Sequence, residues 1–145
     1  MRLFLKDDLP FTMITAAYQG KAAEISDVLV DTGSATTILS ADAVYAIRIV
    51  PLPEDTLHVI RGVGGSELVF SRCMGYLQVG TQSLSDFETE IGGMDYGFEI
   101  SGILGMDFLS RAGAIVNLRA MMMEFNGNAK YPEANRLFFM KTAEV

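Results

Sequence analysis

The chain of 145 residues contains one cysteine, one histidine, four prolines and no tryptophan. A lone cysteine, Cys73, forms no disulfide within the chain, so the sequence shows no sign of an oxidising compartment. No uncharged apolar run reaches the length of about 18 residues that suggests a membrane-spanning helix. These absences predict a cytoplasmic protein. A longer chain from which a leader or membrane anchor had been removed would have the same sequence features.

Few side chains are available for nucleophilic catalysis. A Ser-His-Asp triad would have to use His58, the only histidine, which we instead place on a strand. Cys73 lies in an apolar stretch without the His and Asn or Asp neighbours that a thiol nucleophile needs, so we expect a small buried hydrophobe. Asp86, Glu88 and Glu90 alternate and would share one strand face, which is either solvated, the favoured interpretation, or able to bind a hard cation.

Positive charge is scarce, with 11 Lys and Arg against 18 Asp and Glu and a formal net charge of −7. An acidic surface repels phosphates and anionic lipid headgroups on average. We therefore expect no nucleic-acid partner and no membrane partner. No sequence feature calls for a metal or another cofactor, and none is expected.

Short β-favouring runs bounded by Gly, Pro, Asn or Asp recur along the whole chain. They span residues 11–18, 25–30, 56–63, 67–79, 86–91, 114–117 and 121–125. This spacing predicts an all-β fold, a barrel or a sandwich, with short helices at 40–46, capped by Ser40, and at 106–112. Since no linker or internal repeat divides the chain, residues 1–145 are expected to form one domain.

The most informative stretch is Val-Leu-Val-Asp-Thr-Gly-Ser at residues 28–34. An apolar strand would hold Asp31 rigidly, Gly33 would permit close backbone approach, and the hydroxyls of Thr32 and Ser34 are able to donate to the carboxylate. The same residues also suit an ordinary turn after a strand. Taken alone, this stretch leaves both interpretations open.

Two further segments follow in order. Residues 60–66 read Ile-Arg-Gly-Val-Gly-Gly-Ser, which is either a hairpin turn or a glycine-rich flap over a bound peptide. A phosphate-binding loop is disfavoured because the Gly-Lys-Ser/Thr ending is missing and no helix follows. Residues 100–109 read Ile-Ser-Gly-Ile-Leu-Gly-Met-Asp-Phe-Leu, an apolar strand that runs through glycine into a helix.

The ordered combination of these three motifs resembles the retropepsin-like (retroviral-type, clan AA) aspartic protease family, in its cellular and bacterial forms. The resemblance covers about residues 25–118. It implies a closed acid-protease barrel with one or two short helices, formed by a single domain that pairs as a homodimer. It also implies an aspartic endopeptidase that hydrolyses peptide bonds, with residues 60–66 at the flap tip.

The resemblance assigns roles residue by residue. Asp31 would be the catalytic carboxylate, Thr32 would lock the two active-site loops together, Gly33 would contact substrate through its backbone, and Ser34 would donate to Asp31 and so lower the working pH. The flap and the floor of the substrate groove would be built from Ala35, Arg61, Gly62, Val63, Gly64 and Gly65.

One chain carries a single Asp-Thr-Gly and so would supply half of a catalytic pair. Two copies of Asp31 facing each other across a two-fold axis would share a proton and activate water. The expected partners are therefore a second copy and a peptide or protein substrate. An alternative is a catalytically silent peptide- or protein-binding module on the same fold. Self-processing, a habit of the resembled family, is a third possibility.

Two positions depart from the viral pattern together. Ala35 stands where viral members carry an acid, and Met106 stands where they carry the arginine that pairs with it. Loss of both charges leaves no uncompensated ion, so other contacts would have to secure the dimer. The apolar residues 137–139 are candidates for an interface, although core packing is favoured.

Overall fold

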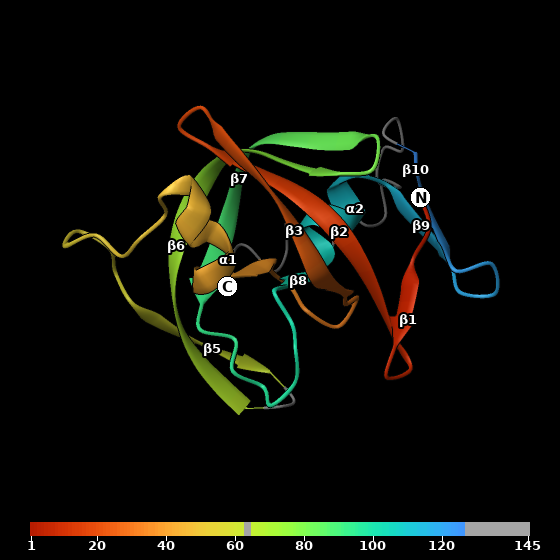
Figure 1. The fold of residues 1–145 in the computed structure, drawn as a ribbon, viewed down its shortest axis with the longest axis horizontal. Coiled ribbons are helices and arrows are strands. Elements are labelled where there is room, and N and C mark those ends of the chain that lie inside the picture. Colours follow the sequence, from red (N-terminus) through yellow and green to blue (C-terminus); the bar gives the residue numbers. More distant parts are fainter. Residues whose placement is uncertain (63–64, 127–145) are drawn as a thin grey trace, which may run out of the picture.

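The computed structural model describes residues 1–62 and 65–126, and within them the fold is mostly β (Figure 1). The strands are β1 (Phe4–Lys6), β2 (Leu9–Tyr18), β3 (Lys21–Val30), β4 (Ile38–Ser40), β5 (His58–Gly62), β6 (Gly65–Val79), β7 (Gln82–Gly92), β8 (Gly102–Leu104), β9 (Ala114–Asn117) and β10 (Met122–Phe125). The helices are α1 (Ala41–Val44), the 3-10 helix η1 (Tyr45–Ile47) and α2 (Met106–Arg111).

Eight strands form one sheet in the order β1-β2-β3-β8-β4-β7-β6-β5, and β9 pairs with β10 in a second, smaller sheet. Most neighbours are antiparallel, but β3 runs parallel to β8 and β4 runs parallel to β7. Strand β2 also pairs with β6, through Thr15–Ala17 against Tyr76–Gln78. The parallel β3–β8 pairing joins two segments that lie far apart in the sequence, and both of them carry motifs.

Alternation along the strands explains how they build the core. In β6, Phe70, Arg72 and Met74 are buried, whereas Cys73 between them is exposed. Phe70, Met74 and their neighbours on other strands belong to the main apolar core, which α2 closes on one side with Phe108 and Leu109. Cys73 was expected to be buried, and this expectation is wrong because its side chain projects from the face of β6 opposite to the core.

A second, smaller apolar cluster lies apart from the main core. Its buried members are Phe11, Ile38, Met94 and Ile100, and Leu29, Ile60 and Ile103 pack against it partly buried. The cluster therefore combines residues from β2, β3, β4, β5 and β8 with the segment between β7 and β8. Through Leu29 it supports the end of β3, two residues before Asp31.

The helices occur where the sequence predicted them, with adjusted ends. Helix α2 ends at Arg111, and the region 40–46 divides into α1 and η1, which stops where Arg48 adopts a left-handed conformation with φ 64°. Ser40 precedes α1 as expected, but its side chain makes no capping hydrogen bond. Ser40 is instead the buried last residue of β4, where it pairs with Gly92.

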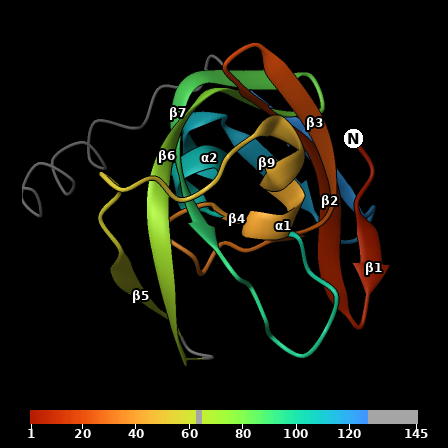
Figure 2. The same cartoon turned by 60° about the vertical axis from the view of Figure 1, so that its left-hand side comes forward.

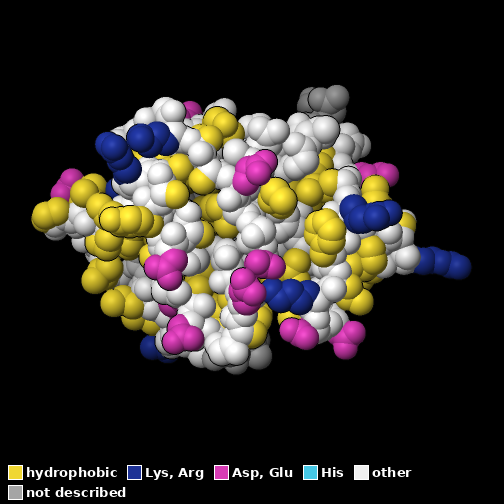
Figure 3. All heavy atoms as spheres, in the orientation of Figure 1, with side chains coloured by type: hydrophobic (Ala, Val, Ile, Leu, Met, Phe, Trp, Pro, Cys, Tyr) yellow, Lys and Arg dark blue, Asp and Glu magenta, His cyan; other side chains and the backbone are white. Residues whose placement is uncertain are grey.

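Figure 2 shows that α1 and α2 lie on the inner side of the curved strands, while the β5–β6 hairpin extends away from the body. Acidic and basic side chains are interspersed with exposed apolar ones on the face shown in Figure 3. In the described part of the chain, no helix has the length and apolarity needed to cross a membrane.

Candidate active site

Asp31 follows directly after β3, at the point where β3 lies beside β8. Val28 and Val30 are buried in the main core, and the Asp31 backbone N–H donates to the Leu104 carbonyl at 3.0 Å. The Asp31 side chain is partly exposed. A rigid strand pair therefore presents one carboxylate that water or a ligand is able to reach.

The backbone of the following turn orients this carboxylate. The Gly33 N–H donates to Asp31 Oδ1 at 2.8 Å, and the Ser34 N–H donates to the Asp31 carbonyl at 3.3 Å. A Cβ at Gly33 would lie only 3.1 Å from Asp31 Oδ1. Glycine at this position therefore leaves room for the carboxylate, which an added Cβ would crowd.

Ser34 does not take the role expected from the sequence. Its hydroxyl donates to the Thr36 carbonyl at 2.7 Å rather than to Asp31. A serine hydroxyl has one proton to donate, so this bond leaves none for the carboxylate. Ser34 therefore stabilises the loop after Asp31. The expected hydrogen bond from Ser34 to Asp31, on which a lower working pH depended, is not formed.

The second motif packs directly on this loop. The Met106 N–H donates to the Ser34 carbonyl at 2.8 Å, and the Asp107 N–H donates to the Ala35 carbonyl at 3.2 Å. A Cβ at Gly105 would lie 2.4 Å from the Thr36 carbonyl oxygen and 3.0 Å from the Ser34 carbonyl oxygen. The glycine of Ile-Leu-Gly is therefore required for the close contact between the loop and the start of α2.

A hydrogen-bond network centred on Thr37 and Asp107 secures the same junction. The fully buried Thr37 donates from its backbone N–H to Asp107 Oδ2 at 2.9 Å and from its hydroxyl to Asp107 Oδ1 at 2.7 Å. The Thr37 hydroxyl also accepts from the Gly105 N–H at 3.1 Å. Sequence reasoning missed this network, although an acid in the first turn of a helix is a recognisable signal for such a role.

The sequence around this site matches a known protein family. The model of the family described as "Aspartyl protease" matches residues 14–108, which is more than half of the chain and includes the first two motifs and all but the last residue of the third. The chain belongs to the aspartyl protease family. It is an aspartic-type endopeptidase, a hydrolase.

The fold of this protease resembles that of a solved protease structure. It is similar to the crystal structure of a retropepsin-like aspartic protease from Rickettsia conorii, with a TM-score of 0.59 and 15% sequence identity. The match covers 86% of this chain and 97% of that chain. The mostly β, retropepsin-like fold predicted from the motifs is therefore confirmed. A comparison with curated protein sequences gives no match.

The remaining loop residues of the protease face outward. Thr32 and Ala35 are exposed, and so is Met106 beside them at the start of α2. Within residues 1–62 and 65–126, the Thr32 hydroxyl makes no hydrogen bond. The two positions that lack the viral charge pair thus lie on the surface next to the Asp31 loop, while residues 137–139 lie outside the described part.

The glycine-rich segment forms the expected hairpin. Arg61 pairs with Ser66 and Gly62 pairs with Gly65, so these residues stand at the end of β5 and the start of β6. Arg61 is exposed, and Gly65 has φ +130°, which favours glycine. Val63 and Gly64, the other expected flap residues, lie outside the described residues.

His58 lies on β5, as predicted, and its Nε2 atom is 3.0 Å from Glu90 Oε2 on β7. Glu90 also accepts from the Ser71 hydroxyl at 3.0 Å. Asp86 and Glu88 are exposed to solvent, as the favoured interpretation of this strand face expected. No group of three or more potential metal ligands occurs among the residues that the structure describes.

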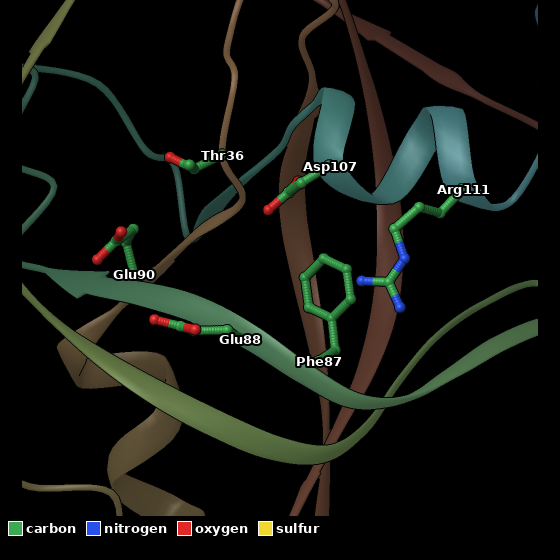
Figure 4. Close-up of a pocket in the computed structure, with 6 residues that line it drawn as sticks. All are labelled: Thr36, Phe87, Glu88, Glu90, Asp107 and Arg111. Atoms are coloured by element: carbon green, nitrogen blue, oxygen red, sulfur yellow. The ribbon is translucent and has the colours of Figure 1, made fainter. Parts of the chain in front are cut away.

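A pocket lies beside the Asp31 loop, between β7 and α2 (Figure 4). It is lined by Thr36, Phe87, Glu88, Glu90, Asp107 and Arg111. Figure 4 shows Glu88 and Glu90 on β7 at one side of the pocket, while Arg111 projects from α2 next to the Phe87 ring, 5.3 Å from its centroid. Asp107 is already bonded to Thr37, and Glu90 is already paired with His58 and Ser71. We therefore regard this pocket mainly as the place where the Asp31 loop, β7 and α2 meet.

Proposed function

We propose that this aspartyl protease cleaves peptide bonds with water activated between two Asp31 carboxylates, one from each subunit of a homodimer. The observation that carries the proposal is the single Asp-Thr-Gly, whose carboxylate is rigidly held, oriented by the Gly33 N–H and partly exposed. Two nearby carboxylates that share one proton supply both a base and an acid.

The surroundings of Asp31 support a shared active centre. Thr32 is exposed and makes no hydrogen bond within the described residues, which suits a contact to the equivalent loop of a second copy. Ala35 and Met106 are exposed nearby and carry no charge, so a two-fold interface here would bring no unpaired ion into contact. The pairing of β2 with β6 supports a closed acid-protease barrel as the frame of each subunit.

The substrate would lie extended across the dimer axis, in a groove between the Asp31 loops and the β5–β6 hairpin. Its backbone would pair with protein strands as an added strand. In this proposal Thr32, Gly33 and Ser34 support the active site, and Ala35, Arg61, Gly62, Val63, Gly64 and Gly65 contact the substrate. A cytoplasmic location and a single domain over residues 1–145 remain predictions from the sequence.

The test is cleavage of an unbiased peptide mixture by wild type and Asp31→Asn, read by mass spectrometry across acidic to neutral pH. The variant keeps the side-chain shape but removes the ionisable group, so we expect cleavage to fall by about a thousandfold or more. The dimer mass should be unchanged.

Asp42→Asn is the matched control, because Asp42 is exposed on α1 and makes no hydrogen bond through its side chain among the described residues. It should cleave like wild type. Equal cleavage by wild type and Asp31→Asn would contradict the proposal, whereas a dimeric wild type that cleaves at no pH would favour the peptide-binding alternative.

A further inference from the structure

The segment 93–101, between β7 and β8, extends from the same side of the molecule as the β5–β6 hairpin (Figures 1 and 2). Near its end, the Lys6 ammonium donates to the Glu99 carbonyl at 3.0 Å and also pairs with Asp27 at 3.1 Å. Near its start, Met94 is buried in the second apolar cluster, which includes Ile60 of β5. The segment is therefore fixed to the body of the protein at one end and touches the hairpin at the other.

Glu67 makes the polar connection between the hairpin and this segment. It lies on β6 opposite Ile60, close to the end of the hairpin. Its Oε1 atom accepts from the Met94 N–H at 2.5 Å, and its Oε2 atom accepts from the Tyr96 hydroxyl. Hydrogen bonds to an ionised carboxylate are stronger than those between neutral groups.

The surroundings of Glu67 are shaped for its carboxylate. A Cβ at Gly92 would lie 2.6 Å from Glu67 Oε1 and 3.0 Å from a methyl carbon of Val69. Tyr96 is 41% exposed, and its partial burial, reinforced by the hydrogen bond to the neighbouring Glu67 carboxylate, raises its pKa above the usual range. The Tyr96 hydroxyl therefore keeps its proton and remains a donor throughout the pH range in which a protease is assayed.

Within the described residues, few other contacts restrain the hairpin near its end. Strand β5 is the last strand of the large sheet and pairs there only with β6, and the ion pair between His58 and Glu90 of β7, at 3.0 Å, lies at the opposite end of β5. Val59 and Leu68, which face each other across the hairpin, are each 56% exposed, so this face of the hairpin has little packing to hold it in place. A few hydrogen bonds near its end are then able to decide how often it stays against the body.

We propose that Glu67 is a positioning residue that latches the β5–β6 hairpin to the 93–101 segment, so that the two sides of the substrate groove close together. This inference rests on the proposed function in treating the hairpin as the flap over the groove. Substrate enters when the hairpin lifts and is gripped only when it is closed. The apparent affinity for substrate therefore depends on the fraction of closed molecules.

The first arm of the test measures the latch without any cleavage. Hydrogen exchange at the Met94 amide is compared in wild type, Glu67→Gln and Tyr96→Phe, together with the amides of β5. Glu67→Gln removes the charge with little change of shape, and we expect the Met94 amide and the β5 amides to exchange about 3- to 10-fold faster. Unchanged exchange at both places would overturn the proposal.

The second arm measures peptide cleavage. Both variants should raise KM by about 3- to 10-fold while kcat stays within about 2-fold, because a lost latch lowers the closed fraction without altering Asp31. An unchanged KM, or a fall in kcat alone, would overturn the latch.

Matched controls are Glu88→Gln, an exposed acid on β7, and Tyr45→Phe, a 70% exposed tyrosine. Both should match wild type in the two arms, and a control that behaves like Glu67→Gln would also count against the proposal. If wild type cleaves no peptide, the proposed function fails, yet the exchange arm still decides whether Glu67 holds the hairpin.

Discussion

At the scale of single residues, the candidate site is built by backbone groups around one carboxylate. The motif predicted where Asp31 would lie and why glycine follows it, because an acid after a buried strand and a close backbone approach are local properties. It did not predict the partner of the Ser34 hydroxyl, which depends on a rotamer and on the nearby Thr36 carbonyl. Nor did it reveal the bonds of Thr37 to Asp107, since these residues are 70 positions apart.

Gly105 offers a sharp test of the contact between the Asp31 loop and α2. A Gly105→Ala methyl group would lie 2.4 Å from a backbone oxygen and 2.6 Å from a backbone carbon of Thr36, and backbone atoms do not move aside easily. We expect a loss of about 1–3 kcal/mol in the free energy of unfolding, measured with urea, with the slope unchanged.

Gly93→Ala is the matched control for that substitution. An added Cβ at Gly93 meets no atom within 4 Å, and Gly93 does not have a positive φ. Alanine at a compatible site is neutral or stabilises by up to about 1 kcal/mol through the unfolded state. Equal destabilisation by the two alanines would mean that the close contact at Gly105 does not restrict the loop.

At the scale of elements, most strands were predicted near their observed positions. Strands β6 and β9 lie where β-favouring residues bounded by turn residues indicated. The three-residue strands β1 and β4 were missed, because so short a run has no periodicity and forms only when a neighbour pairs with it. The parallel β3–β8 pairing likewise depends on the whole fold and was not predicted.

The connection between η1 and β5 shows how an irregular segment is held. Asp55 accepts from the Leu52 N–H at 2.6 Å and from Arg72 of β6 at 2.5 Å. Arg72 is buried, donates to the Val50 carbonyl at 3.3 Å, and stacks on Phe70 at 5.3 Å from the ring centroid. One arginine in the core therefore fixes the segment that leads into the hairpin.

Replacing this arginine should be costly. Arg72→Met keeps an apolar stem but leaves Asp55 without its ionic partner at a site that is only 14% exposed, so we expect about 3–5 kcal/mol of destabilisation. The midpoint of urea unfolding measures the effect. Arg119→Met, at an exposed position after β9, should change stability by less than about 0.5 kcal/mol. If Arg72→Met unfolds like wild type, the ion pair does not secure this segment.

At the scale of the whole molecule, the central feature is that one chain carries half of a catalytic pair. The family and the fold identify a protease, and the exposed loop around Asp31 is where a second subunit would complete it. Counting motifs in the sequence was enough to suggest the dimer. The contacts that would hold two copies together were beyond the sequence, because the charge pair used by viral members is absent at Ala35 and Met106.

The most direct test of a shared active centre is to mix subunits. A fixed amount of wild type is incubated with increasing Asp31→Asn under conditions that allow exchange, and cleavage is measured. If each active centre needs Asp31 from both chains, random pairing lowers the activity to about one half with equal amounts and to about one tenth with a ninefold excess of variant. Activity that stays constant as the variant is added would show that each chain cleaves on its own and would contradict the account.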